Sequence, residues 1–169
     1  MTTFSGAFDN HVTREETVNN FTTHETDIMQ FADLILSKRP ANHEISFSLE
    51  GNKGSLSIGM SSWSIDPQFP NRNFKFKVSS VDERTDFLKV VGWNVTTFKN
   101  IVDGFRKTNC ERVYTDDEYI NFDYKTGTWS SFGYHVRSKP MNDSLRKVFE
   151  KDSIQILNNR VTIGRASAV

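Results

Sequence analysis

The sequence predicts an α+β fold, a single domain in which helices pack on one face of an antiparallel sheet. Two kinds of pattern support this prediction. Apolar and polar residues alternate in segments 43–60, 73–78 and 120–136, which is typical of half-buried strands. Between these segments, apolar residues recur at helical spacing behind residues that cap helices. The sheet is expected to consist of a three-strand meander plus hairpins.

Composition limits the classes of function. The chain has 169 residues and 14 phenylalanines, enough to bury an aromatic core. Its formal net charge is zero, which argues against a strong non-specific nucleic-acid binder. Cys110 is the only cysteine, so neither an intrachain disulfide nor a cysteine-based zinc cluster can form. Since the histidines show no metal-ligand spacing and no phosphate-binding glycine loop or dinucleotide fingerprint is present, we predict no metal and no cofactor.

The ends of the chain show little pattern. We expect a flexible arm at residues 1–12, one domain at 13–164 and a loose tail at 165–169. The first residues have no cationic start followed by an apolar run, and no stretch approaches 18 apolar residues. These features predict a soluble protein of the cytoplasm, with no membrane partner.

The N-terminal part of the domain predicts helices. Capping boxes at 13–16 and 22–25 indicate a short helix and then a longer one that ends near Lys38, before Pro40. The longer helix has a single apolar stripe, formed by Ile28, Phe31, Ala32 and Ile35.

Residues 43–60 predict a β-hairpin, the clearest structural signal in the sequence. A two-residue turn at Asn52-Lys53 would place every apolar side chain on one face. The expected pairs are Leu49 with Leu56, Phe47 with Ile58, and Ile45 with Met60. A third antiparallel strand is expected at 73–78, with its phenylalanines directed inward.

Two helices and a second hairpin are expected next. Asp82 is positioned to cap a helix that Gly92 interrupts, and Asn94 or Thr96 can start another. Alternating residues on both sides of a turn at 125–127 then predict the second hairpin.

The C-terminal part predicts a helix and a final hairpin. Pro140 lies near the expected start of the helix. Its apolar side would contain Leu145, Val148 and Phe149. The final hairpin is expected to join Ile154 and Ile156 to Val161 and Ile163 across Asn158-Asn159. This order of elements resembles that of the small secretion-chaperone fold, in which a helix, three strands, a helix, two strands and a helix follow one another.

The outer face of the three-strand sheet is the first candidate binding surface. Small hydroxyls and ammonium groups on a flat sheet can meet phosphates or an acidic protein partner. An ordinary solvated sheet face has the same alternation. The residues expected on this face are Ser46, Ser48, Ser55, Ser57, Lys75 and Lys77.

Segment 86–102 is the second candidate. It resembles the helix-turn-helix DNA-binding pattern, because apolar residues occupy the usual positions around Gly92. The resemblance implies that a second helix enters the major groove. Leu88 departs from the pattern, which prefers a small residue there, and a plain pair of core helices also explains the spacing. The residues directed toward DNA would be Thr96, Thr97, Lys99 and Asn100.

The third candidate is an acidic cluster at 116–123. Asp116, Asp117, Glu118 and Asp123 could hold a hard cation or act in general acid–base chemistry, as in a metal-dependent enzyme. The run lacks the spacing of a calcium loop, and a solvated loop explains it equally. No residue is singled out as catalytic or as a metal ligand.

These observations favour a non-enzymatic binding protein that acts through protein–protein interaction, as an adaptor, an inhibitor or a chaperone-like protein. A nucleic-acid-binding protein that uses segment 86–102 or the Ser/Lys sheet face is the alternative, and a metal-dependent enzyme that uses the acidic cluster at 116–123 is a further one. Exposed strand edges are also compatible with a homodimer.

Overall fold

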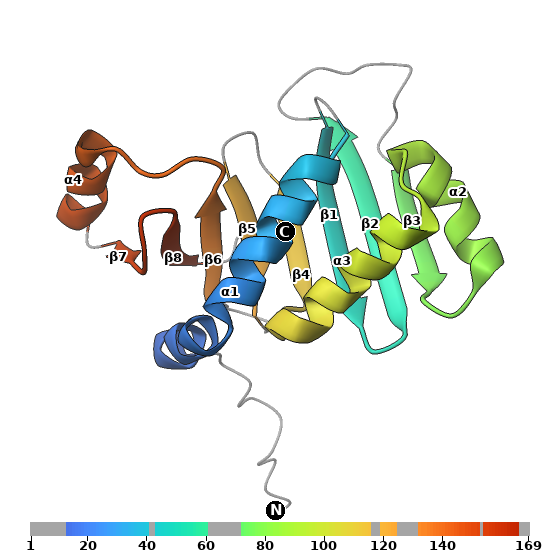
Figure 1. Cartoon of the computed structure of the whole chain (residues 1–169), viewed down its shortest axis with the longest axis horizontal. Coiled ribbons are helices and arrows are strands. Elements are labelled where there is room, and N and C mark those ends of the chain that lie inside the picture. Colours follow the sequence, from blue (N-terminus) through green and yellow to red (C-terminus); the bar gives the residue numbers. More distant parts are fainter. Residues whose placement is uncertain are drawn as a thin grey trace, which may run out of the picture.

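The computed structural model describes residues 13–40, 43–60, 72–115, 119–124, 132–152 and 154–165. Within these ranges, eight antiparallel strands form one sheet, and four helices accompany it (Figure 1). The strand order across the sheet is β3-β2-β1-β4-β5-β6-β8-β7. The predicted α+β class is confirmed. The predicted N-terminal arm and residues 166–169 of the predicted tail lie outside the described residues.

The first three strands form the predicted meander. They are β1 (His43–Glu50), β2 (Lys53–Met60) and β3 (Arg72–Lys77). Burial alternates along β1, so one face of the strand is apolar and the other is not. The buried apolar residues of the meander are Ile45, Phe47, Leu49, Leu56, Ile58 and Phe76.

The predicted register of the β1–β2 hairpin is wrong by two residues. Phe47 lies opposite Leu56 and not opposite Ile58. The turn begins one residue earlier than predicted, at Gly51 and Asn52, and Gly51 has a φ of 58°. Glycine adopts this left-handed conformation without the steric cost that a Cβ would add. A shift of two residues leaves each side chain on its predicted face, so the apolar face is as expected.

The remaining strands extend the sheet beyond β1. β4 (Arg112–Thr115), which the sequence did not predict, pairs with β1 on one side and with β5 (Tyr119–Asp123) on the other. β5 and β6 (Phe132–Arg137) form the predicted second hairpin. Its expected turn at 125–127 lies outside the described residues. β4 therefore joins the two hairpins into one sheet.

α1 (Arg14–Lys38) is one helix where two were predicted. Thr13 caps it with the predicted capping box. The second predicted start is a kink at His24 (φ −119°, ψ 19°), and Thr22 donates its hydroxyl to the carbonyl of Val18 at 3.0 Å. Among the described helices, none has both the length and the apolar character needed to cross a membrane.

α2 (Val81–Val91) and α3 (Val95–Thr108) follow the meander as predicted. The side chain of Ser80, and not that of Asp82, caps α2. α2 ends at Gly92, which has left-handed backbone angles, so the chain leaves the helix there before α3 begins.

Aromatic rings join the helices to the apolar face of the sheet, across which α1 and α3 lie side by side (Figure 1). Phe31 of α1 contacts Phe122 of β5, with ring centroids 5.4 Å apart. Phe105 of α3 stacks on Phe47 of β1 at 5.1 Å. Large side chains buried on both sides of this interface contribute most of the folding energy, as is usual for aromatic cores.

A buried hydrogen-bond network crosses the same interface. The hydroxyl of Tyr134 in β6 donates to the carbonyl of Thr17 in α1 at 2.9 Å. The side-chain amide of Asn20 donates to this hydroxyl at 2.9 Å and to the carbonyl of Thr108 in α3 at 3.1 Å. The network therefore fixes both helices relative to β6 and satisfies polar groups that would otherwise be buried without partners.

α4 (Asp143–Lys151) differs from its prediction in two respects. Asn142 caps it, so Pro140 precedes the helix. No residue of α4 is buried, and Val148 is 51% exposed. α4 lies beside β7 at the end of the sheet, far from α1 and α3 (Figure 1). The narrow apolar stripe of α4 is therefore only partly covered by the rest of the protein.

The last hairpin forms, with a register that differs from the prediction by one residue. β7 (Gln155–Ile156) pairs with β8 (Val161–Arg165), which includes the first residue of the predicted tail. Ile156 lies opposite Thr162 and not opposite Val161.

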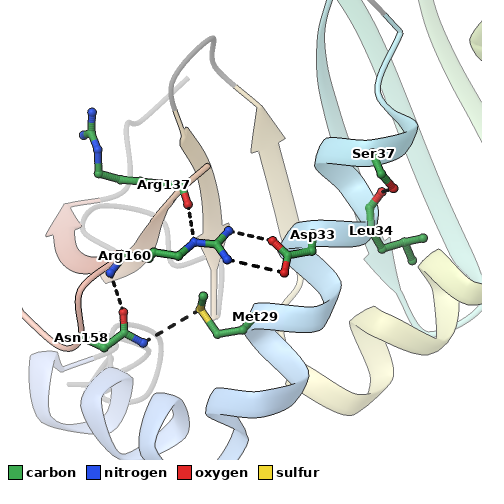
Figure 2. Close-up of polar contacts among 7 residues, drawn as sticks. All are labelled: Met29, Asp33, Leu34, Ser37, Arg137, Asn158 and Arg160. Carbon is green, nitrogen blue, oxygen red and sulfur yellow. Dashed lines mark hydrogen bonds and ion pairs between the residues drawn. The ribbon is translucent and has the colours of Figure 1, made fainter. Parts of the chain in front are cut away.

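Polar contacts fasten this hairpin to α1 (Figure 2). The guanidinium of Arg160 contacts both carboxylate oxygens of Asp33, at 2.7 and 3.5 Å, and its Nε donates to the carbonyl of Arg137 at 2.8 Å. Asn158 reaches the sulfur of Met29 at 4.0 Å and accepts the main-chain N–H of Arg160. Arg160 therefore joins α1, β6 and the final hairpin.

Candidate binding surface on the open face of the sheet

The six residues predicted to share the outer face of the meander do share it. Ser46 lies opposite Ser57, while Ser48 lies opposite Ser55, which in turn lies opposite Lys75. Because their neighbours along each strand point to the helices, these side chains point to the other side of the sheet. We call this surface the Ser–Lys face, formed by Ser46, Ser48, Ser55, Ser57, Lys75 and Lys77.

The centre of the Ser–Lys face is an array of hydroxyls with lysines at its side. The hydroxyl oxygens of Ser48 and Ser55 are 2.7 Å apart and form a hydrogen bond. The four serines are half-buried, whereas Lys75 and Lys77 are exposed. The hydroxyls can therefore donate and accept at a fixed surface, and the ammonium groups can reach a ligand above it.

An open hollow of about 400 Å³ lies at the end of the face nearest the β1–β2 turn. Part of the Ser–Lys face lines it, together with residues from β1, β2 and α2. We call it the basic hollow, which is lined by Lys53, Lys75, Lys77, Glu50, Glu83, Ser48, Ser55, Gly54 and Phe76.

The electrostatics of the basic hollow favour anions. Its three lysines form no ion pair within the part of the chain that the structure describes. Glu83, in the first turn of α2, directs its carboxylate to the main-chain N–H of Lys77, which it accepts at 2.6 Å. Glu50 lies across from Lys53 in the strand pair. Three ammonium groups against two carboxylates leave the hollow positive.

Lys53 is the functional candidate that the sequence reasoning missed. The predicted turn contained Lys53, so its side chain was not assigned to either face. The observed turn places Lys53 in β2, opposite Lys77 of β3. The signal was present in Gly51, because a glycine at the first turn position favours the earlier turn.

The helix-turn-helix candidate lies on the other side of the sheet from the Ser–Lys face, because α3 packs on the apolar face. Asn94 caps α3 by accepting the N–H of Thr97 at 2.7 Å. Thr97 is only 9% exposed, so its predicted orientation toward DNA is wrong. Thr96, Lys99 and Asn100 are exposed. The two candidate surfaces are not brought together.

Most of the acidic cluster cannot be placed, because Asp116, Asp117 and Glu118 lie outside the described residues. Asp123 is 7% exposed, and burial raises the pKa of its carboxyl. The carboxylate of Asp123 lies 3.8 Å from the guanidinium of Arg112, whose positive charge lowers the pKa of Asp123. Among the described residues, no three His, Cys, Asp or Glu side chains gather closely enough to hold a metal ion.

A second group of polar side chains, not singled out by the sequence, continues the open face across β5, β6 and β8. The ring of His135 stacks on Tyr119, with centroids 5.4 Å apart. Atoms of the same ring leave no room for a Cβ at Gly164. Burial, with a smaller effect of Arg137, lowers the pKa of His135. The side-chain oxygen of Asn121, opposite His135, is buried and has no hydrogen-bond partner among the residues that the structure describes. Stacking therefore fixes the orientation of the imidazole, and burial disfavours its protonated form.

Cys110 has the character of a structural residue. It is 4% exposed, and burial raises the pKa of its thiol to about 12. The thiol stays protonated near neutral pH and does not act as a nucleophile there.

No known protein family, no curated protein and no solved structure matches this chain. The resemblance to the secretion chaperones is one of element order, and the structure adds a second helix after the meander, a third strand before α4 and the final hairpin to that order.

Proposed function

We propose that this chain is a non-enzymatic binding protein that holds an acidic segment of a partner protein in the basic hollow. The supporting observation is the placement of Lys53, Lys75 and Lys77, without ion-pair partners among the described residues, around one hollow of about 400 Å³. The strands that carry them are fixed by the aromatic core behind them, so the site is formed before its ligand arrives.

The charge pattern favours a short acidic peptide over a nucleic acid. A nucleic-acid backbone carries a charge about every 3.4 Å along a strand, and proteins that bind it present an extended basic surface. Here Glu50 and Glu83 border the lysines. Farther across the sheet, the side chain of Glu44 accepts the hydroxyl hydrogen of Tyr114 at 2.6 Å. A basic region that acidic residues border suits a few carboxylates.

Fluorescence anisotropy with a labelled octaglutamate peptide tests the proposal. In the test variant, Lys53, Lys75 and Lys77 are all changed to Gln. We expect the dissociation constant to rise about tenfold, because each exposed ion pair contributes roughly 0.2–1 kcal/mol. The matched control changes three exposed lysines on the helices to Gln, namely Lys89, Lys107 and Lys147, and we expect no more than about a twofold change.

Binding of a labelled single-stranded and a labelled duplex oligonucleotide is measured in the same way. Weak binding of both, with retained peptide binding, supports the proposal. Tighter binding of an oligonucleotide, lost on changing Thr96, Lys99 and Asn100 together to Ala, would assign the function to the helix-turn-helix-like segment. Equal peptide binding by the test and control variants would refute the basic hollow as the site.

A further inference from the structure

We infer that the acidic segment binds as an added strand along the edge of β3 that pairs with no described strand, an inference that rests on the proposed function. β3 is the end strand of the described sheet. The N–H of Val78 donates to the carbonyl of Asn52 at 2.8 Å, so even-numbered residues of this segment direct their main-chain groups to β2. Odd-numbered residues direct theirs away from the sheet. These are Asn73, Lys75 and Lys77.

Local contacts satisfy one end of this edge and leave the rest open. The main-chain N–H of Lys77 donates to the carboxylate of Glu83 at 2.6 Å. The carbonyl of Lys77 accepts the N–H of Ser80 at 3.0 Å. The outward groups of Lys75 and Asn73 have no partner in the described ranges, and both residues are exposed. The open edge offers two donors and two acceptors at the spacing that an antiparallel strand requires.

Side-chain charge then selects the occupant. A residue paired with Lys75 has its side chain on the same face, with Cβ atoms about 4.5–5.5 Å apart. Acidic residues at alternate positions of the added strand would therefore lie beside Lys75 and Lys77, above the basic hollow. α2 reaches this edge at Lys77, where Glu83 accepts the main-chain N–H, while its Phe87 packs on Phe76 (ring centroids 4.6 Å apart) on the apolar face.

A second copy of the chain is a poor occupant of this edge. Antiparallel pairing of two β3 strands would gather Lys75 and Lys77 of both copies on one surface, where like charges repel. An extended acidic peptide removes the repulsion and pairs the open main-chain groups.

The probe is a labelled heptapeptide in which Glu alternates with Thr, because β-branched Thr favours an extended chain. In an antiparallel added strand, the amides of the Glu residues face β3 and those of the Thr residues face solvent. N-methylation of the Glu amides should weaken binding about tenfold, since it removes main-chain hydrogen bonds. N-methylation of the Thr amides is the matched control, and we expect no more than about a twofold change.

A variant of the protein tests the same edge from the other side. Asn73→Pro removes one outward N–H without changing charge, and proline is tolerated on edge strands at such positions. Asn73→Thr keeps the N–H. We expect the proline variant to bind the Glu–Thr peptide about fivefold more weakly than the threonine variant, at similar unfolding temperatures.

The outcomes separate this inference from the proposed function. If both methylated peptides bind equally while the three-lysine variant binds weakly, strand addition is wrong and the basic hollow remains. If the three-lysine variant binds as the wild type does, the proposed function itself fails. A dimer that the peptide does not dissociate would place a second copy on β3 and would also overturn strand addition, whereas a monomer that binds as described supports it.

Discussion

Gly104→Ala in α3 provides a sharp test of how the helices pack on the sheet. Helix propensity alone predicts stabilisation, because alanine is favoured over glycine inside a helix by about 1 kcal/mol. The structure predicts the opposite. A Cβ at Gly104 would lie within 2.7 Å of Cε2 and Cγ of Phe31, closer than van der Waals contact permits. Phe31 is 3% exposed and is held by Phe105 and Phe122, with ring centroids 5.1 and 5.4 Å away.

Because the ring cannot turn aside, the helices must separate. Overpacking of this kind costs up to about 3 kcal/mol, so the net loss in unfolding free energy is about 2 kcal/mol after the gain in propensity. For a chain of this length, that loss lowers the unfolding temperature by about 4–8 °C. Thermal unfolding followed by circular dichroism measures it.

A double-mutant cycle with Phe31→Leu provides the control. The smaller side chain makes room, so Gly104→Ala should become neutral or stabilising in that background. A rise in unfolding temperature for Gly104→Ala alone, or strictly additive effects of the two changes, would refute the packing described for α1 and α3.

Three further predictions concern other parts of the structure. Tyr134→Phe should lower the unfolding free energy by about 1–3 kcal/mol, because the carbonyl of Thr17 loses the hydroxyl donor and the amide of Asn20 loses one of its two acceptors. An unchanged urea midpoint would contradict the network. Burial and Arg137 lower the pKa of His135 below its ordinary 6.5, so the unfolded state takes up the proton first as pH falls. Wild-type stability should therefore fall more steeply than that of His135→Gln between pH 6.5 and 5, and parallel curves would contradict this. Arg160→Ala should cost about 1–2 kcal/mol and Asp33→Ala less than about 1 kcal/mol, since only the first leaves the Arg137 carbonyl without its donor. Equal urea midpoints for the two variants would show that the ion pair alone matters.

Alternation predicted which side chains of the meander face the core, but it could not fix how the strands pair. The period of a strand is two residues, so any shift by two satisfies the same pattern. The turn decides between such registers, and the choice of Gly51-Asn52 over Asn52-Lys53 depends on local backbone conformation. The same choice determined whether Lys53 belonged to the candidate site.

Other differences arose where the sequence signal is short or depends on distant partners. β4 contains one buried large apolar residue, Val113, within an acidic segment, which is too little for periodicity to detect. The stripe on α4 was visible, but amphipathicity does not say how much of a helix its neighbours cover, and Val148 is half exposed. Thr97 lies at a position where the helix-turn-helix pattern expects an outward residue, yet its side chain is buried.

The most direct test of the central claim is a map of amide chemical shifts during titration with the Glu–Thr peptide. If the open face of the meander is the binding surface, the largest changes should occur at Lys53, Lys75, Lys77 and their strand neighbours, with none of comparable size on α3 or α4. Changes centred on the exposed residues of α3, or no saturable change at any amide, would contradict the account.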